Sequence, residues 1–380
     1  KRGIEEADEK FNIINLVCTG AMMKIFPCRN IAGKTLEWYS QSDQLPQDMD
    51  NDKWVFIRKS MSYVNEMIVM KKYNDACLLL EKIKKYQQKE CDGLLPADNK
   101  FKAEKIYNQF DYSKSVAMAC ICIGLICFIY YCHCMASQKR TSRKAIIILN
   151  ILLWIVFTYL SAAICLRGYV SNHLPLSNGF ETMQFMAWCT LLLTFLLQRK
   201  FAMLLPFGFL LCGLTLMVSM LGESNPQITQ LMPVLQSPLL SIHVVVIMIA
   251  YSLLAFIMLN GVTAVILHQS QKECKEQIER LQIISQIILY PAIFLLAIGI
   301  FIGAVWANVS WGRYWGWDPK EVWALITMLV YALALHPRSL PWFHRTMFFH
   351  VFCITAFITV LITYFGVNFL LGGMHSYANG

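Results

Sequence analysis

The chain has 380 residues, of which 57% are hydrophobic and 15% are charged. Its mean hydropathy is +0.47 and its formal net charge is +9. A soluble protein of this length could not bury so much apolar surface, so the composition excludes a soluble globular protein and predicts an integral membrane protein. The modest positive charge lies largely in short loops and gives no indication of nucleic-acid binding.

Charged residues divide the chain into two parts. Residues 1–115 contain 19 Lys or Arg and 17 Asp or Glu, whereas residues 116–380 contain 14 and 7. We therefore expect a polar domain at 1–115 and a lipid-embedded domain at 116–380. Apolar residues between Trp54 and Ile83 recur at helical spacing, which predicts a mainly helical first domain, and the polar segment 40–53 is predicted to be a loop.

The second domain contains eight apolar segments long enough to be candidate membrane spans of roughly 20 residues. They lie at about 116–134, 145–166, 180–197, 201–220, 243–267, 283–306, 320–336 and 346–372. The predicted fold class is an all-α polytopic membrane protein with about eight transmembrane helices and a mainly helical N-terminal extracytoplasmic domain.

Basic residues in the connecting loops predict the orientation. The loops after the first, third, fifth and seventh spans contain eleven Lys or Arg, and the opposite loops contain three. By the positive-inside rule, the first domain, the loop after the sixth span and the C-terminus face outward. The first domain must then be translocated, yet Lys1–Lys10 contains no signal peptide. We expect that earlier membrane spans precede residue 1 or come from another polypeptide.

Half of the ten tryptophans lie in or beside an outward loop predicted at residues 306–321, which we call the tryptophan segment. Such density of aromatic rings is typical of a flat, rigid surface at the membrane edge, and two or three rings would suffice for a simple aromatic belt. We therefore favour a platform for a planar aromatic ligand. Its candidate residues are Trp306, Trp311, Gly312, Arg313, Tyr314, Trp315, Gly316, Trp317, Asp318 and Trp323.

Charged residues of this segment have two interpretations each. Asp318, Pro319 and Glu321 have the spacing of a helix N-cap with a capping box, and that structural role explains them as well as a ligand role does. Arg313 and Lys320 can pair with the carboxylates of a ligand or with lipid phosphates. No residue is assigned to acid–base catalysis with certainty, and Asp318 is the one candidate.

Histidines at the span ends point to haem. His243 begins the fifth span and His375 ends the eighth, both at the outer face beside the tryptophan segment. Two imidazoles flanking an aromatic platform suit bis-histidine ligation of haem iron, although a single such residue is often only interfacial. His336 lies at the inner face, about 24 Å away along its helix. It is either an interfacial residue or a ligand of a second, inner haem site.

The remaining histidines and the cysteines carry weaker predictions. His350 lies within a span and is predicted to be buried with a hydrogen-bond partner. Cys132-His133-Cys134 is a poor metal site, because adjacent helix positions point to different faces. The first domain contains Cys18, Cys28, Cys77 and Cys91, which can form disulfides of undetermined connectivity. The sequence contains no Cys-x-x-Cys-His, so this chain is not itself a c-type cytochrome.

The run Trp311-Gly-Arg-Tyr-Trp-Gly-Trp-Asp-Pro-Lys-Glu321 resembles the WWD motif of the haem-handling protein family. Further motifs resemble its system II cytochrome c synthase branch, CcsA or the fused CcsBA. These are Pro175-Leu-Ser-Asn178 followed by Glu181, His243 after Ser-Pro, His336 in Ala-Leu-His, and Gly-Val-Asn368 leading to His375-Ser-Tyr377. The resemblance covers roughly residues 116–380. Residues 1–115, including the segment 103–108, more loosely resemble the outward domain that precedes this half in fused synthases.

This resemblance implies a cytochrome c haem lyase. His243 and His375 would be the outer axial ligands, and His336 would be one ligand of a membrane-embedded site. Ferrous haem b would be the substrate, and an apocytochrome c with a Cys-x-x-Cys-His segment would be the acceptor. A CcsB-like N-terminal half or subunit would supply the partner of His336. The expected location is the bacterial inner membrane, with the first domain, the tryptophan segment and the C-terminus facing the periplasm.

Three alternatives stay open. A haem-delivery protein of the same superfamily would use the same residues but pass haem to a chaperone. A membrane electron-transfer subunit would hold b-type haem permanently, usually between histidines inside facing helices. A small-molecule transporter is the weakest alternative, because the sequence gives no sign of discontinuous midplane helices or paired intramembrane charges.

Overall fold

The computed structural model describes residues 2–29, 35–47, 49–91, 93–220, 226–228, 237–270 and 274–371, with side chains from residue 7 to residue 367 within these ranges. Of these described residues, 77% are helical. It divides into two compact units, Lys1–Asn99 and Lys100–Gly380. The boundary predicted at residue 115 follows the start of the first apolar helix and stays a prediction.

The first unit combines helices with a small hairpin. Helix α1 spans Arg2–Cys18, α2 spans Asn51–Val69 and α3 spans Tyr73–Cys91. Strands β1 (Phe26–Arg29) and β2 (Leu36–Tyr39) pair antiparallel, with Phe26 opposite Tyr39. The sequence predicted helices here but not the hairpin, and α2 begins inside the segment predicted to be a loop.

A small apolar core holds the hairpin against α2 and α3. Phe26, Ile57, Val64 and Ile83 are buried together. Two side chains of α3 anchor the strand beside this core: the Tyr86 hydroxyl donates to the Pro27 carbonyl at 2.9 Å, and the Gln87 amide donates to the Ile25 carbonyl at 2.7 Å. These bonds compensate for the short length of the strands.

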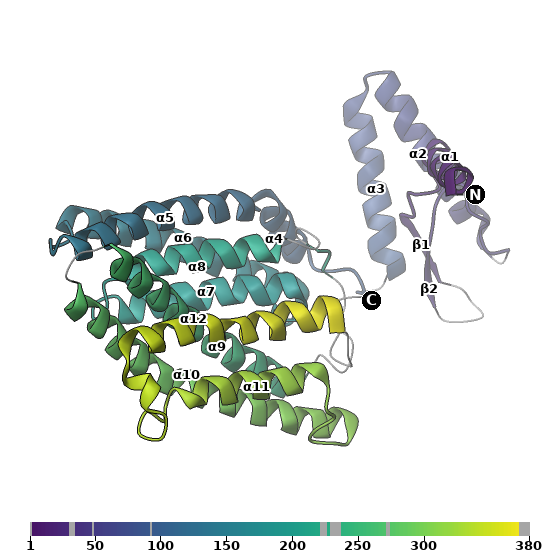
Figure 1. Cartoon of the computed structure of the whole chain (residues 1–380). Helices are drawn as coiled ribbons and strands as arrows, with labels where there is room; N and C mark the ends of the chain where they lie inside the picture. The colour runs from purple at the N-terminus through teal and green to yellow at the C-terminus, as the bar shows by residue number, and fades with distance from the viewer. Residues whose placement is uncertain are drawn as a thin grey trace. The chain divides into compact units, whose positions relative to one another are not determined.

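The second unit is a helical bundle in which the long helices run side by side (Figure 1). After α4 (Asp98–Gln109), which begins at the end of the first unit, its α-helices are α5 (Ser113–Ala136), α6 (Arg143–Ser171), α7 (Gly179–Leu197), α8 (Leu204–Ser219), α9 (Pro238–Gln269), α10 (Lys275–Trp311), α11 (Pro319–Leu333) and α12 (Thr346–Leu361). A 3-10 turn, Pro341–His344, precedes α12, and a π-helical stretch, Ile362–Leu371, continues it.

Each of the eight predicted apolar segments coincides with a helix of this unit. Within the described ranges, six helices are long and apolar enough to cross a membrane, namely α5, α6, α7, α9, α10 and α12 with the first part of its π-helical continuation. Helix α8 has 16 residues and α11 has 15, and both fall short of that length. The chain is therefore a multi-pass helical membrane protein, and the number eight stays a prediction.

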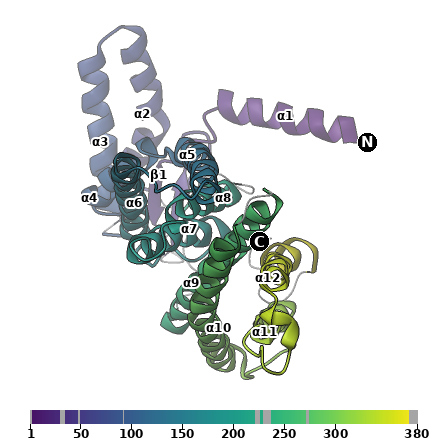
Figure 2. The ribbon, with the colours of Figure 1, turned by 60° about the vertical axis from the view of Figure 1, so that its left-hand side comes forward.

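Helix α9 joins two apolar cores. One core lies among α5, α6, α7 and α8 and includes Phe256 of α9, and the other lies among α9, α10, α11 and α12 and includes Leu254. Figure 2 shows α9 between the two groups of helices. Because both cores share it, α9 is packed on two sides, and His243 lies near its N-terminal end.

Candidate haem site

The tryptophan segment begins as a continuation of a helix. Helix α10 extends through Trp311 and ends at Gly312, which has a left-handed backbone (φ 72°) suited to glycine at a helix C-cap. Residues 306–311 of the predicted loop are therefore helical, and the connection to α11 is short. Helix α11 begins at Pro319 with Asp318 as its N-cap, and Asp318 and Glu321 form the reciprocal capping box. The predicted cap is confirmed.

Glu321 fixes the conformation of the connection. One of its carboxylate oxygens accepts the amide of Gly316 at 2.8 Å and the amide of Asp318 at 3.2 Å. The residue between them, Trp317, has a positive φ of 56°. A bulky residue in this left-handed region costs about 1–3 kcal/mol. The hydrogen bonds on both sides therefore hold Trp317 in a conformation that the free chain avoids.

The aromatic rings differ in exposure and do not form one flat surface. Trp306 is buried and packs edge to face on Trp311, with centroids 4.8 Å apart. Trp315 and Trp317 are 6.1 Å apart with planes at 89°. Trp317 is 76% exposed and Tyr314 is 61% exposed. The predicted platform thus comprises a pair of rings, buried Trp306 and half-buried Trp311, next to projecting rings, because tryptophans favour edge-to-face contact.

His243 lies against the C-terminal half of α10. It is half-buried in the second turn of α9, whose first residue is Pro238. The imidazole Nδ1 is 2.6 Å from the Gly299 carbonyl oxygen. Gly303, one turn further along α10, lies directly against the imidazole ring. Trp306 follows Gly303 by three residues, so both lie on one side of the helix. The fold therefore brings His243 to the helix face that carries the buried tryptophan.

The other predicted ligands lie elsewhere. His336 is exposed beyond the far end of α11, about 22 Å along the helix from Pro319, and its Nδ1 is 2.9 Å from the Ala332 carbonyl oxygen. His375 lies outside the described residues. Among the residues that are described, no group of three or more His, Cys, Asp or Glu is arranged to hold a metal ion.

The prediction that His350 is buried with a hydrogen-bond partner is confirmed. His350 is fully buried, and its Nε2 is 3.2 Å from the Ile278 carbonyl oxygen. In the Cys132-His133-Cys134 run, both cysteines are buried and the histidine is exposed, so the three side chains do not converge.

The cysteines of the first unit are thiols in this structure. Cys18 and Cys77 are exposed, whereas Cys28 and Cys91 are buried. Burial raises the pKa of the Cys28 and Cys91 thiols, and the carboxylate of Glu90 raises both further. These two side chains are therefore protonated and poorly nucleophilic at neutral pH.

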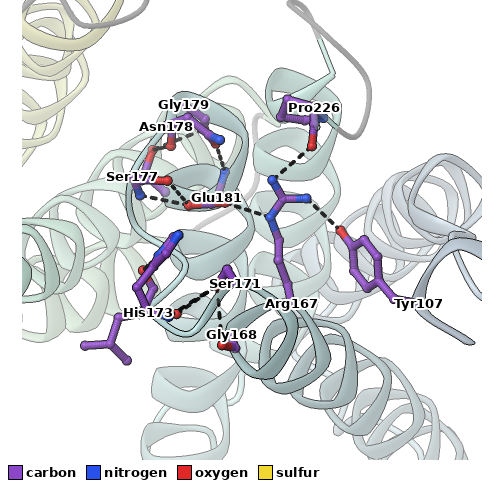
Figure 3. A network of polar contacts seen from close by, with 12 residues as sticks. Tyr107, Arg167, Gly168, Ser171, His173, Ser177, Asn178, Gly179, Glu181 and Pro226 are labelled. Atoms are coloured by element: carbon purple, nitrogen blue, oxygen red, sulfur yellow. Dashed lines mark hydrogen bonds and ion pairs between the residues drawn. The ribbon is translucent and has the colours of Figure 1, made fainter. Parts of the chain in front are cut away.

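A buried ion pair joins α6 to the first turn of α7 (Figure 3). Arg167 Nε is 2.7 Å from Glu181 Oε1, and the two side chains are only 1% and 3% exposed. The other guanidinium nitrogens donate to the Tyr107 hydroxyl at 3.2 Å and to the Pro226 carbonyl at 3.1 Å. This pair links α4, α6 and α7 with the segment that contains Pro226.

Hydrogen bonds to Glu181 complete this network. Its second carboxylate oxygen accepts the Ser177 amide at 2.8 Å and the Ser177 hydroxyl at 2.6 Å. The Asn178 side chain accepts the Glu181 amide at 2.9 Å as the N-cap of α7. The sequence motif that contains Glu181 did not reveal its pairing with Arg167. The available signal was a lone Arg and a lone Glu in a region with few charges, where burial requires pairing.

Comparison with known proteins places the chain in a family. Residues 176–375, more than half of the chain, match the cytochrome C assembly protein family. The chain is 31% identical over 379 residues to Protein NrfI of Wolinella succinogenes, covering 99% of this chain and 42% of that protein. It is 35% identical over 253 residues to the cytochrome c biogenesis protein CcsA of Chlamydomonas reinhardtii, covering 63% of this chain and 71% of that protein.

A third relative, CcsA of Prochlorococcus marinus strain MIT 9301, is 31% identical over 276 residues, covering 64% of this chain and 87% of that protein. The chain thus spans less than half of NrfI and most of the CcsA proteins. Its apolar helices agree with the membrane character of this group. The chain belongs to the cytochrome c assembly protein family.

Proposed function

We propose that this chain binds ferrous haem b between His243 and the tryptophan segment, at the periplasmic face of a bacterial inner membrane, and attaches it to apocytochrome c. The observation that carries the proposal is the position of the His243 imidazole on the α10 face that leads, within one turn, to Trp306. An axial ligand beside aromatic rings suits a planar iron porphyrin. Membership of the cytochrome c assembly protein family supports haem as the ligand of this site.

Each side chain has a distinct role in this proposal. His243 would bind the iron, with His375 as the second axial ligand. Trp317 and Tyr314, which project from the connection, would contact the porphyrin edge. Arg313 is exposed in the same connection and suits a haem propionate, because a guanidinium binds carboxylates through two parallel hydrogen bonds.

The reaction itself needs positioning more than acid–base catalysis. A cysteine thiol of the acceptor adds across a haem vinyl group, so that a carbon–sulfur bond forms and the thiol hydrogen ends on the neighbouring vinyl carbon. The addition consumes no oxidant or reductant, although the thiols and the iron must already be reduced. Fixing haem against the acceptor segment therefore supplies the main rate enhancement. Asp318 has a structural role as the helix cap, which leaves acid–base catalysis by it without support.

His336 would belong to a separate inner haem site. It lies at the opposite end of α11 from the tryptophan segment and cannot share an iron with His243. A CcsB-like half or subunit would supply its partner ligand, and the chain's match to 42% of NrfI is compatible with such an arrangement.

The test is co-expression of the chain with the CcsB-like half and an acceptor that carries Cys-x-x-Cys-His. Covalent haem on the acceptor, absent with His243→Gly, supports a synthase. Haem bound to the chain with no covalent transfer to the acceptor would instead favour a haem-delivery protein. Haem that remains bound in His243→Gly would refute the site.

A further inference from the structure

We propose that Gly303 is a positioning residue for the His243 imidazole. Its missing side chain lets the ring lie against the α10 backbone, where Nδ1 meets the Gly299 carbonyl and the ring presents Nε2 as the ligand atom. This inference rests on the proposed function, in which His243 binds the haem iron.

Steric contact is the first argument. A Cβ atom on Gly303 would lie 2.7 Å from Cε1 and 2.8 Å from Nδ1 of His243. Carbon atoms in van der Waals contact are about 3.5–4.0 Å apart, so a methyl group cannot share this space with the ring. An imidazole is rigid and turns about only two side-chain torsions, so the ring as a whole would have to move.

The hydrogen bond is the second argument. A carbonyl oxygen only accepts, so at 2.6 Å from Gly299 the imidazole Nδ1 carries the proton. Neutral imidazole with a protonated Nδ1 has its lone pair on Nε2, which is the form that binds a metal through that atom. A carbonyl that orients a ligating histidine in this way also raises its basicity, and loss of such a contact costs about 10–100-fold in metal affinity.

Gly179 supplies a matched control. It lies in the first turn of α7, and a Cβ there would meet the Tyr364 hydroxyl oxygen at 3.6 Å, which is an ordinary van der Waals distance. Gly179→Ala therefore adds the same methyl group to a helix and leaves both the imidazole and the Gly299 carbonyl in place.

The experiment compares haem titrations of detergent-purified wild type, Gly303→Ala, Gly179→Ala and His243→Gly, with reduced visible spectra of each. We expect haem affinity about 10–100-fold weaker in Gly303→Ala and near wild type in Gly179→Ala. Equal affinity in the two alanine variants, with weakened binding in His243→Gly, would overturn the positioning role alone. Unchanged binding in His243→Gly would instead overturn the proposed function.

A double-mutant cycle tests the contact even where Gly303→Ala folds poorly. Replacing His243 with Ala removes the ring and leaves room for the new methyl group. The loss of thermal stability, or of accumulation in membranes, caused by Gly303→Ala should largely disappear in the His243→Ala background. An equal loss in both backgrounds would show that the ring does not occupy this space and would refute the inference.

Discussion

Replacing Glu181 with Ala should lower the free energy of unfolding of the bundle far more than replacing an exposed glutamate that also pairs with an arginine. Glu181→Ala leaves the buried Arg167 guanidinium without its carboxylate and deprives the Ser177 amide and hydroxyl of their acceptor. Breaking a buried pair from one side costs about 3–5 kcal/mol, because the remaining charge stays desolvated. The Tyr107 and Pro226 contacts compensate only in part, since neither carries a full negative charge.

Glu276→Ala is the matched control. Glu276 pairs with Arg280 at 2.6 Å, but both side chains are 72% exposed, so its loss should cost about 0.5 kcal/mol or less. The assay is titration of SDS into the mild-detergent micelle, with helix unfolding followed by circular dichroism. The double variant Arg167→Met/Glu181→Leu should recover much of the loss, because no unpaired charge remains. Equal effects of Glu181→Ala and Glu276→Ala would refute this reasoning.

Three further predictions concern the candidate site and the first unit. Glu321→Ala frees the two amides that fix the connection, so haem content measured from the reduced spectrum should fall severalfold while the amount of folded protein changes little. Trp317→Gly removes the backbone strain of a bulky residue at positive φ, so the free energy of unfolding in the SDS titration should stay the same or increase, while the haem content falls. The thiols of Cys28 and Cys91 should react slowly with iodoacetamide at pH 8 and faster as the pH rises, because their raised pKa keeps the thiolate scarce. The exposed Cys77 should react readily at pH 8, and peptide mass spectrometry measures the alkylation of all three.

Local rules predicted much of the bundle. Long apolar runs predicted helices at every segment from α5 to α12, because hydropathy alone makes them visible. The cap at Asp318 was predictable because its residues are neighbours in sequence. The break between α2 and α3 was not predictable, because Lys71 adopts a left-handed backbone (φ 59°) with no Gly or Pro beside it to signal a turn. The four-residue strands of the hairpin are likewise too short to give a periodic signal.

Contacts between helices could not be predicted from the sequence. The sequence marked His243 as a candidate ligand, but its contact with Gly303 depends on the register of α9 against α10. The Arg167–Glu181 pair depends on how α6 and α7 dock, and neither residue identifies its partner alone. Ring orientation in the connection also depends on the folded structure, because Trp315 and Trp317 lie at 89° in the turn that Glu321 holds. The ligand platform itself stays a prediction.

The most direct test of the haem site is the visible spectrum of the purified chain, oxidised and dithionite-reduced, compared with His243→Gly. We predict a low-spin reduced haem spectrum in the wild type, its loss in the variant, and its return when imidazole is added. An unchanged spectrum in His243→Gly would contradict the assignment of this histidine and of the site built around it.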